Sequence, residues 1–101
     1  MEVSDIVLSL RGHDAGTILV VLGVEKQEKE YVLLADGKRR RVEAPKRKKT
    51  KHVRFLTSSE SRAAGKIRAG EKVTNNEVRR ALSEYKDQRE NVGDAHPGVP
   101  Q

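Results

Sequence analysis

Short apolar segments separated by turn residues run from residue 3 to residue 56, a pattern typical of β-strands. The strands that this pattern predicts cover, in chain order, residues 6–10, 17–24, 31–35, 38–43 and 52–56. The second is nearly continuous in apolar residues, which favours burial on both faces or a bend around a barrel corner at Gly23. Five short strands with tight turns suit a small closed barrel, because closure leaves a small sheet with no exposed edge.

The segment after the third predicted strand combines a turn signal with a run of cations. Asp36-Gly37 is the strongest short hairpin signal in the chain, and it predicts that residues 38–43 run antiparallel to the third strand. Pro45 ends that predicted strand. The lysine-rich run 46–51 is expected to form a loop, because its like charges repel one another.

Helix signals replace strand signals after residue 57. Either Ser58 or Ser59 can cap a short helix that ends at Gly70. Thr74-Asn-Asn-Glu77 is a capping box, in which each end residue satisfies the amide of the other, and a helix to about residue 88 is expected to follow. Its apolar face, at helical spacing, consists of Val78, Ala81, Leu82 and Tyr85.

The tail from residue 91 is rich in Gly and Pro, so it is expected to be disordered. The predicted fold is therefore mainly β, with one or two C-terminal α-helices. Its divisions are a small five-stranded barrel at residues 3–56, a helical appendage at 58–89 and a disordered tail at 90–101.

The positive charge of the chain is local. The segment from Asp36 to Arg54 holds ten of the 21 Lys and Arg residues and only two acids, a net charge of +8. Because the whole chain carries +6, the remaining residues sum to −2. A polyphosphate surface rewards such a concentration of cations, since each neutralised phosphate releases condensed counterions.

Composition narrows the class of protein. Only 35% of residues are hydrophobic, so the core of one domain must be small, and three aromatic residues offer little surface for stacking bases. The chain has no Cys, which excludes disulfides and thiolate sites and is compatible with a reducing cytosol. Residues 1–11 lack the features of a signal peptide, and the longest apolar run, 18–22, is too short to span a bilayer. We expect a soluble cytoplasmic protein.

Two segments carry a resemblance to a known family. The first reads Val7-x-x-x-x-Gly12-His-Asp14-x-Gly16-x-x-x-Val20-Val21. It resembles the KOW motif of several large-subunit ribosomal proteins and of NusG-type transcription elongation factors, in which a central glycine corresponds to Gly16. The second reads Val32-Leu33-Leu34-Ala35-Asp36-Gly37-Lys38 and precedes a basic stretch, as in the small bacterial KOW-domain RNA-binding proteins.

The resemblance covers residues 3–56 well and the capped second helix more loosely. It implies an SH3-like barrel whose first hairpin loop and basic face meet RNA. The RNA contacts expected from the charge and the resemblance together are Arg11, Gly12, His13, Gly16, Lys38, Arg39, Arg40, Arg41, Lys46, Arg47, Lys48, Lys49 and Lys51. Recognition of helical shape and backbone is expected over base stacking, because aromatic residues are few.

The sequence offers no arrangement for catalysis. Its three histidines are scattered without metal-ligand spacing, the serines at 58–61 read as helix caps, and no phosphate-binding loop follows the glycines. We therefore expect no enzyme, no cofactor, no metal site and no membrane anchor. The expected partner is RNA, in particular ribosomal RNA of the large subunit with ribosomal proteins as neighbours, bound by a monomer.

Two alternatives remain open at this stage. In the first, the chain is a transcription-elongation-type KOW module that docks on polymerase or a ribosomal protein, and an exposed apolar face on the helix 75–88 would favour it. In the second, it is an assembly or stress factor that binds RNA without sequence preference. The sequence leaves open which RNA helix is bound and whether the protein is a stoichiometric ribosomal component.

Overall fold

The computed structural model describes residues 1–94 of the 101-residue chain. Its elements, in chain order, are β1 (Asp5–Ser9), β2 (Ile18–Lys26), β3 (Glu30–Ala35), β4 (Lys46–Lys49), the 3-10 helix η1 (Thr50–His52), β5 (Val53–Ser58), α1 (Arg62–Arg68) and α2 (Asn75–Asp94). A small antiparallel sheet followed by two C-terminal helices confirms the predicted fold class. No helix among the described residues combines the length and apolarity that crossing a membrane requires.

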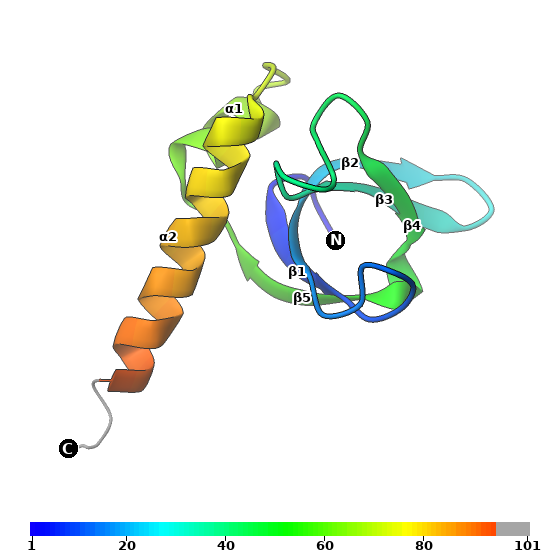
Figure 1. The fold of residues 1–101 in the computed structure, drawn as a ribbon. Helices are drawn as coiled ribbons and strands as arrows, with labels where there is room; N and C mark the ends of the chain where they lie inside the picture. The colour runs from blue at the N-terminus through cyan, green and yellow to red at the C-terminus, as the bar shows by residue number, and fades with distance from the viewer. Residues whose placement is uncertain (95–101) are drawn as a thin grey trace.

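The five strands form one curved antiparallel sheet in the order β4-β3-β2-β1-β5 (Figure 1). The predicted closure into a barrel is wrong: β4 and β5 are the two edges of the sheet, and η1 connects them. A closed sheet has no edges to protect, whereas this sheet keeps one edge that is only four residues long and entirely cationic, Lys46–Lys49. A short, charged edge resists pairing with another chain, so closure is not needed.

Both faces of β1 and β2 are buried, as the nearly continuous apolar pattern of β2 predicted. Neighbouring residues point to opposite sides: Val7 and Val21 belong to an inner cluster enclosed by the curved sheet, and Ile6 and Val20 to an outer cluster under the helices. A register shift between Val21 and Gly23 lies where the sequence predicted a bend in β2. The fold therefore has two small hydrophobic clusters that share the same two strands.

The helices cover the outer side of β1 and β2 (Figure 1). Val78 and Leu82 of α2 are buried in the outer cluster together with Ile67 of α1, while the C-terminal part of α2 projects away from the sheet. The segment 58–89 thus shares a hydrophobic core with the sheet. The apolar face of α2 is covered, and it is covered by this chain's own strands.

The ends of the helices follow local signals with two corrections. The capping box is confirmed: the Glu77 amide donates to Thr74 Oγ1 (3.1 Å), and the Thr74 amide donates to Glu77 Oε1 (2.9 Å). The cap of α1 is Ser61, whose Oγ accepts from the Ala64 amide, and not Ser58 or Ser59. The helix α2 continues to Asp94, so the predicted tail is helical over 90–94. The rest of that predicted tail, 95–101, lies outside the described residues.

The predicted strand at residues 38–43 is wrong, and so is the predicted loop over the lysine run. Residues 36–45 form a wide loop, hereafter the 36–45 loop, and β4 follows it. The cause is the Asp36 carboxylate, whose Oδ1 accepts from the amides of Lys38 (2.8 Å) and Arg40 (2.9 Å). These bonds occupy amides that a two-residue hairpin would have turned toward β3, so pairing begins only at Lys46.

Candidate nucleic-acid interface

The side chains of β4 alternate between the two faces of the sheet. Lys48 lies opposite Val32, which is fully buried in the inner cluster, and the Lys48 side chain is only 8% exposed. Lys49 lies opposite Tyr31, so it points to the other face. One predicted RNA-binding lysine is therefore enclosed by the fold, while its neighbour in the sequence lies on the opposite side of the strand.

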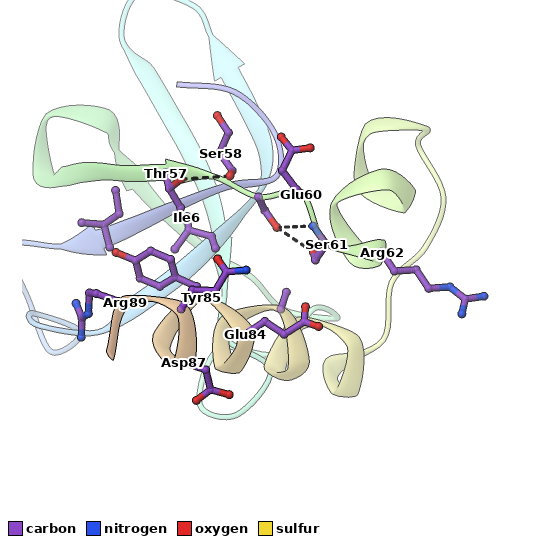
Figure 2. A pocket seen from close by; sticks show the side chains of 14 residues that line it. Ile6, Thr57, Ser58, Glu60, Ser61, Arg62, Glu84, Tyr85, Asp87 and Arg89 are labelled. Carbon is purple, nitrogen blue, oxygen red and sulfur yellow. Dashed lines mark hydrogen bonds between the residues drawn. The ribbon is translucent and has the colours of Figure 1, made fainter. Parts of the chain in front are cut away.

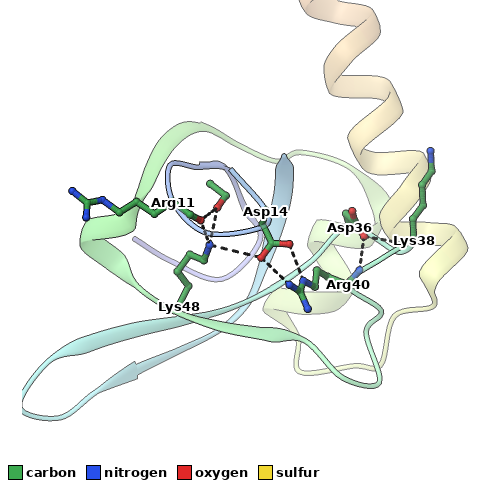
Figure 3. A network of polar contacts seen from close by, with 7 residues as sticks. Arg11, Asp14, Asp36, Lys38, Arg40 and Lys48 are labelled. Atoms are coloured by element: carbon green, nitrogen blue, oxygen red, sulfur yellow. Dashed lines mark hydrogen bonds and ion pairs between the residues drawn. The ribbon is translucent and has the colours of Figure 1, made fainter. Parts of the chain in front are cut away.

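Lys48 supports the loop between β1 and β2 (residues 10–17, hereafter the β1–β2 loop). Its Nζ donates to Ser9 Oγ (2.8 Å) and to the Arg11 carbonyl oxygen (2.6 Å), and it lies 3.7 Å from Asp14 Oδ2 (Figure 3). A Cβ on Gly12 would lie 3.6 Å from the same Nζ. The three partners satisfy the ammonium group within the protein, so we leave Lys48 out of the candidate interface.

Arg40 joins the 36–45 loop to the β1–β2 loop through Asp14 (Figure 3). Its Nε donates to Oδ1 of Asp14 at 2.8 Å and its Nη2 to Oδ2 at 3.1 Å, and the Asp14 side chain is almost completely buried. The hydrogen bond from Arg40 is the largest cause holding the pKa of Asp14 below its ordinary value of 3.8, and the same bond raises the pKa of Arg40. Arg40 thus neutralises an internal carboxylate and is not offered to a ligand.

Two further predicted contacts have acidic partners. Arg47 Nε donates to Glu25 Oε1 at 2.7 Å, and its guanidinium carbon lies 3.7 Å from the centre of the Tyr31 ring. Arg41 Nε lies 3.5 Å from Glu43 Oε2, with both side chains exposed. Ion pairs at the protein surface contribute little free energy. Arg41 and Arg47 therefore lie at the surface with part of their charge offset.

The N-terminal turn of α2 holds the 36–45 loop in place. Asn75 accepts from the Val42 amide (2.8 Å) through Oδ1, and its Nδ2 donates to both carboxylate oxygens of Glu43 (2.8 and 3.0 Å). The Asn75 bond is the largest cause of a lowered pKa at Glu43. Arg79 Nη1 donates to the carbonyl oxygen of Gly37 at 2.5 Å. A helix more than 30 residues away along the chain thereby fixes the loop that presents Lys38 and Arg39, both exposed.

One group of cations lies around His52. The Leu10 amide donates to the His52 carbonyl oxygen at 2.9 Å, which ties the β1–β2 loop to η1. The pKa of His52 is lowered, first by burial and then by the charges of surrounding cations, namely Arg11, Lys51, Lys49 and Lys48. These four charges are therefore close enough to the His52 imidazole to affect its protonation.

We call Arg11, Lys49, Lys51 and His52 the cationic cluster. It is assembled from three places in the chain: the β1–β2 loop, the end of β4 and η1. Within residues 1–89, whose side chains the structure describes, Arg11, Lys49 and Lys51 form no ion pair with an acidic side chain. Lys46 is half-buried on the same face of β4 as Lys48 and also lowers the pKa of Asp14.

The β1–β2 loop beside this cluster keeps an accessible backbone. Gly12 (φ +81°) and Gly16 (φ +88°) both adopt the left-handed conformation that favours glycine. No atom lies within 4 Å of the place that a Cβ on Gly16 would occupy, and His13 is exposed. The Cα side of Gly16 is therefore open to close approach, while the Gly16 amide donates to the Ser9 carbonyl oxygen.

A separate groove of about 980 Å³ lies between α2, the end of β5 and residues 59–62 (Figure 2). Carboxylates of Glu60, Glu84 and Asp87 line it, as do Arg62 and Arg89. This mixture of charges does not favour a polyphosphate. Among the described residues, no three His, Asp or Glu side chains are grouped so as to hold a metal ion.

Sequence reasoning missed the residues that organise the interface. Asp14, Ser9 and Asn75 carry no charge-run or periodicity signal, and their partners lie 26 to 39 residues away. His52 could have been found from its position next to Lys51 at the end of the lysine run. No protein-family model matches the chain, and no curated protein shows significant similarity to it. The resemblance to KOW proteins therefore rests on the residues quoted above.

Proposed function

We propose that this chain is a non-enzymatic, cytoplasmic RNA-binding protein that binds structured RNA through the cationic cluster and the β1–β2 loop. The observation that carries the proposal is the grouping of Arg11, Lys49 and Lys51 around His52, whose pKa their charges help to lower. None of the three cations has an acidic partner among the described side chains. Cations that lie close together without acidic partners repel one another, so a polyanion stabilises them. Phosphates relieve the mutual repulsion and release their counterions on binding.

The buried ion network supports this proposal by holding the interface in one arrangement. Lys48 and Asp14 fix the β1–β2 loop from inside the sheet, so Arg11 and Gly16 keep their positions before RNA arrives. An interface that is ordered in advance loses less conformational entropy on binding. The exposed Lys38 and Arg39 extend the positive surface along the 36–45 loop, which Arg40 connects to Asp14.

The resemblance to KOW-domain proteins narrows the RNA to ribosomal RNA of the large subunit, with ribosomal proteins as neighbours. The alternative of a transcription-elongation-type module that docks on polymerase or a ribosomal protein loses the feature that favoured it, an exposed apolar face on α2. Val78 and Leu82 of that helix pack against Ile6 and Val20 of the chain's own sheet. Non-specific RNA binding in assembly or stress is distinguished by experiment, because it predicts equal affinity for ribosomal and random duplexes.

The interface is tested by measuring affinity for a labelled RNA hairpin from fluorescence anisotropy. A variant with Arg11→Gln, Lys49→Gln and Lys51→Gln is compared with a control of equal charge change, Lys29→Gln, Lys72→Gln and Lys86→Gln, at exposed positions elsewhere. We expect the first to weaken binding about 100-fold, on the order of 1 kcal/mol for each cation, and the control several-fold at most. Equal losses in the two variants would contradict this interface.

The ribosomal target is tested by sedimentation of the native protein through sucrose gradients at low and high salt. Co-migration with large subunits at low salt and release at high salt is the expected result, because the contacts are electrostatic. Protein that stays at the top of the gradient at both salt concentrations would contradict the ribosomal assignment. A hairpin-binding protein with that behaviour would be an RNA binder with another target.

A further inference from the structure

Two large apolar side chains are exposed among the described residues: Leu10, which is bonded to the cationic cluster, and Phe55, which lies on β5 three residues after His52. Phe55 of β5 is 51% exposed, and Leu10 at the start of the β1–β2 loop is 46% exposed. The Leu10 amide is bonded to the His52 carbonyl oxygen, and Phe55 follows His52 by three residues along an extended strand. At about 3.3 Å per residue, the backbone of Phe55 lies roughly 10 Å from that of His52.

Phe55 is the one phenylalanine of the chain, and it contributes to neither hydrophobic cluster. Its neighbours in β5 do contribute: Val53 is buried in the inner cluster, and Leu56 packs against the outer one. The other aromatic side chains are occupied, because Arg47 covers Tyr31 and Tyr85 packs on the outer cluster. Among the described residues, Phe55 is thus the one exposed aromatic ring, whereas Tyr31 and Tyr85 are half-buried.

The charges around this ring decide which ligand suits it. Arg54, the preceding residue, is exposed, and so is Lys51 at the other end of the segment. A second copy of the chain would bring like charges together at this place. The surface of one phenylalanine and one leucine side chain is also far smaller than the roughly 800 Å² that each partner buries in a standard protein interface. A nucleic acid supplies both a negative backbone and a flat apolar surface.

We propose that Phe55 stacks on an unpaired base of the bound RNA, while the cationic cluster holds the phosphates next to it. The inference rests on the proposed function and specifies its substrate: an RNA helix that carries a bulged or splayed nucleotide. Bases within a continuous helix are stacked on one another and offer no free face, whereas an unpaired base does. The scarcity of aromatic residues predicted recognition without stacking, but one exposed ring is enough for one base.

The expected gain in affinity for RNA follows from the strength of base stacking. A base on an aromatic side chain contributes about 1–3 kcal/mol by alanine substitution, which corresponds to roughly 5- to 150-fold in affinity. Three RNAs measure it: a perfect hairpin, the same hairpin with one bulged nucleotide, and the bulged hairpin with an abasic site at that nucleotide. The third RNA keeps the kink and the extra phosphate but removes the base.

The protein is tested as wild type and as Phe55→Leu, Phe55→Trp and Leu10→Ala, with circular dichroism to verify folding. We expect the wild type to prefer the bulged hairpin over the other two RNAs by about tenfold or more. Phe55→Leu loses this preference while keeping its affinity for the perfect hairpin. Phe55→Trp keeps the preference, because it retains an aromatic face, and Leu10→Ala keeps it because no ring is changed.

Each contrary result has a distinct meaning. Equal wild-type affinity for the three RNAs overturns stacking and leaves the proposed function intact. A Phe55→Leu variant that weakens binding to all three RNAs equally also overturns it. Binding to none of them at low salt overturns the proposed function itself. Phe55-dependent binding to vesicles of anionic phospholipid, without a preference for the bulged hairpin, would assign the exposed ring to a membrane surface and overturn the inference.

Discussion

The guanidinium of Arg40 holds the buried carboxylate of Asp14 with two hydrogen bonds, of 2.8 and 3.1 Å, and this pair joins two loops that are 26 residues apart. The same carboxylate lies 3.7 Å from the ammonium group of Lys48. A single acid thus neutralises two of the cations in the basic segment. These two cations stabilise the fold, whereas their neighbours Lys49 and Lys51 form no ion pair among the described side chains and belong to the proposed interface.

Adjacent lysines of β4 are expected to behave in opposite ways. Lys48→Gln removes the donor to Ser9 and Arg11 and leaves part of the Asp14 charge uncompensated, so we expect a loss of about 2–3 kcal/mol in the free energy of unfolding. Lys49→Gln is expected to change that free energy by less than about 0.5 kcal/mol and to weaken RNA binding. Urea denaturation and anisotropy measure the two effects. Unchanged stability in Lys48→Gln would contradict a structural role for this lysine.

Two glycines with similar backbone angles are expected to differ in their tolerance of a methyl group. Gly16 (φ +88°) has open space around it, so Gly16→Ala should cost only the left-handed conformation, about 1 kcal/mol. At Gly37 (φ +78°) a Cβ would lie 2.4 Å from the Asn75 carbonyl oxygen and 2.9 Å from Arg79 Cγ. Gly37→Ala should therefore cost roughly 3 kcal/mol, because strain and overpacking add. Similar melting temperatures for the two variants would refute the packing of the 36–45 loop on α2.

Acid is expected to weaken the junction between α1 and α2 through Glu77. Its pKa falls from 4.5 to about 2, mainly because Lys66 donates a hydrogen bond to it and secondly because the Thr74 amide does. A lowered folded-state pKa stabilises the protein above pH 4.5, and this stabilisation disappears as the pH falls toward 2. Glu77→Gln should therefore show a flatter decline of unfolding free energy over this range than wild type. Glu71→Gln, which removes an exposed acid, is the control. A decline in Glu77→Gln identical to that of wild type would contradict the pairing of Glu77 with Lys66.

RNA binding is expected to take up a proton at His52. In the free protein, burial and the surrounding cations Arg11, Lys51, Lys49 and Lys48 lower its pKa. Bound phosphates reverse the sign of the local potential and favour the imidazolium, so affinity should rise as the pH falls toward the pKa of His52 in the free protein and level off below it. His52→Gln should remove this pH dependence, and His13→Gln should retain it. Loss of the dependence in His13→Gln alone would assign the proton to the β1–β2 loop.

Local signals in the sequence predicted the parts of the fold that local bonds determine. The capping box at Thr74 and Glu77 is contained within four residues, and it forms as expected. The dipeptide Asp36-Gly37 also predicted a turn, but Asp36 widens it through the amides of Lys38 and Arg40. Asn75 and Arg79 then hold the widened loop from another element. No pattern within residues 36–45 reveals those contacts.

The candidate site was predictable as a segment and not as a set of side chains. Charge density located the basic stretch, whereas the fold divides that stretch into paired and unpaired cations. The division depends on strand register and on one buried acid: Lys48 faces inward because β4 pairs with β3, and it is tolerated there because Asp14 compensates it. Both facts arise from contacts between distant residues, so composition and periodicity could not supply them.

The most direct test of the central claim is the salt dependence of RNA binding. Each phosphate contact adds about 0.7–0.9 to the slope of the logarithm of the binding constant against the logarithm of salt concentration. The variant with Arg11→Gln, Lys49→Gln and Lys51→Gln should therefore show a slope shallower than wild type by about 2–3, and the control with Lys29→Gln, Lys72→Gln and Lys86→Gln an unchanged slope. A wild-type slope near zero, or one that is equally steep in the cluster variant, would contradict the claim that these cations bind RNA.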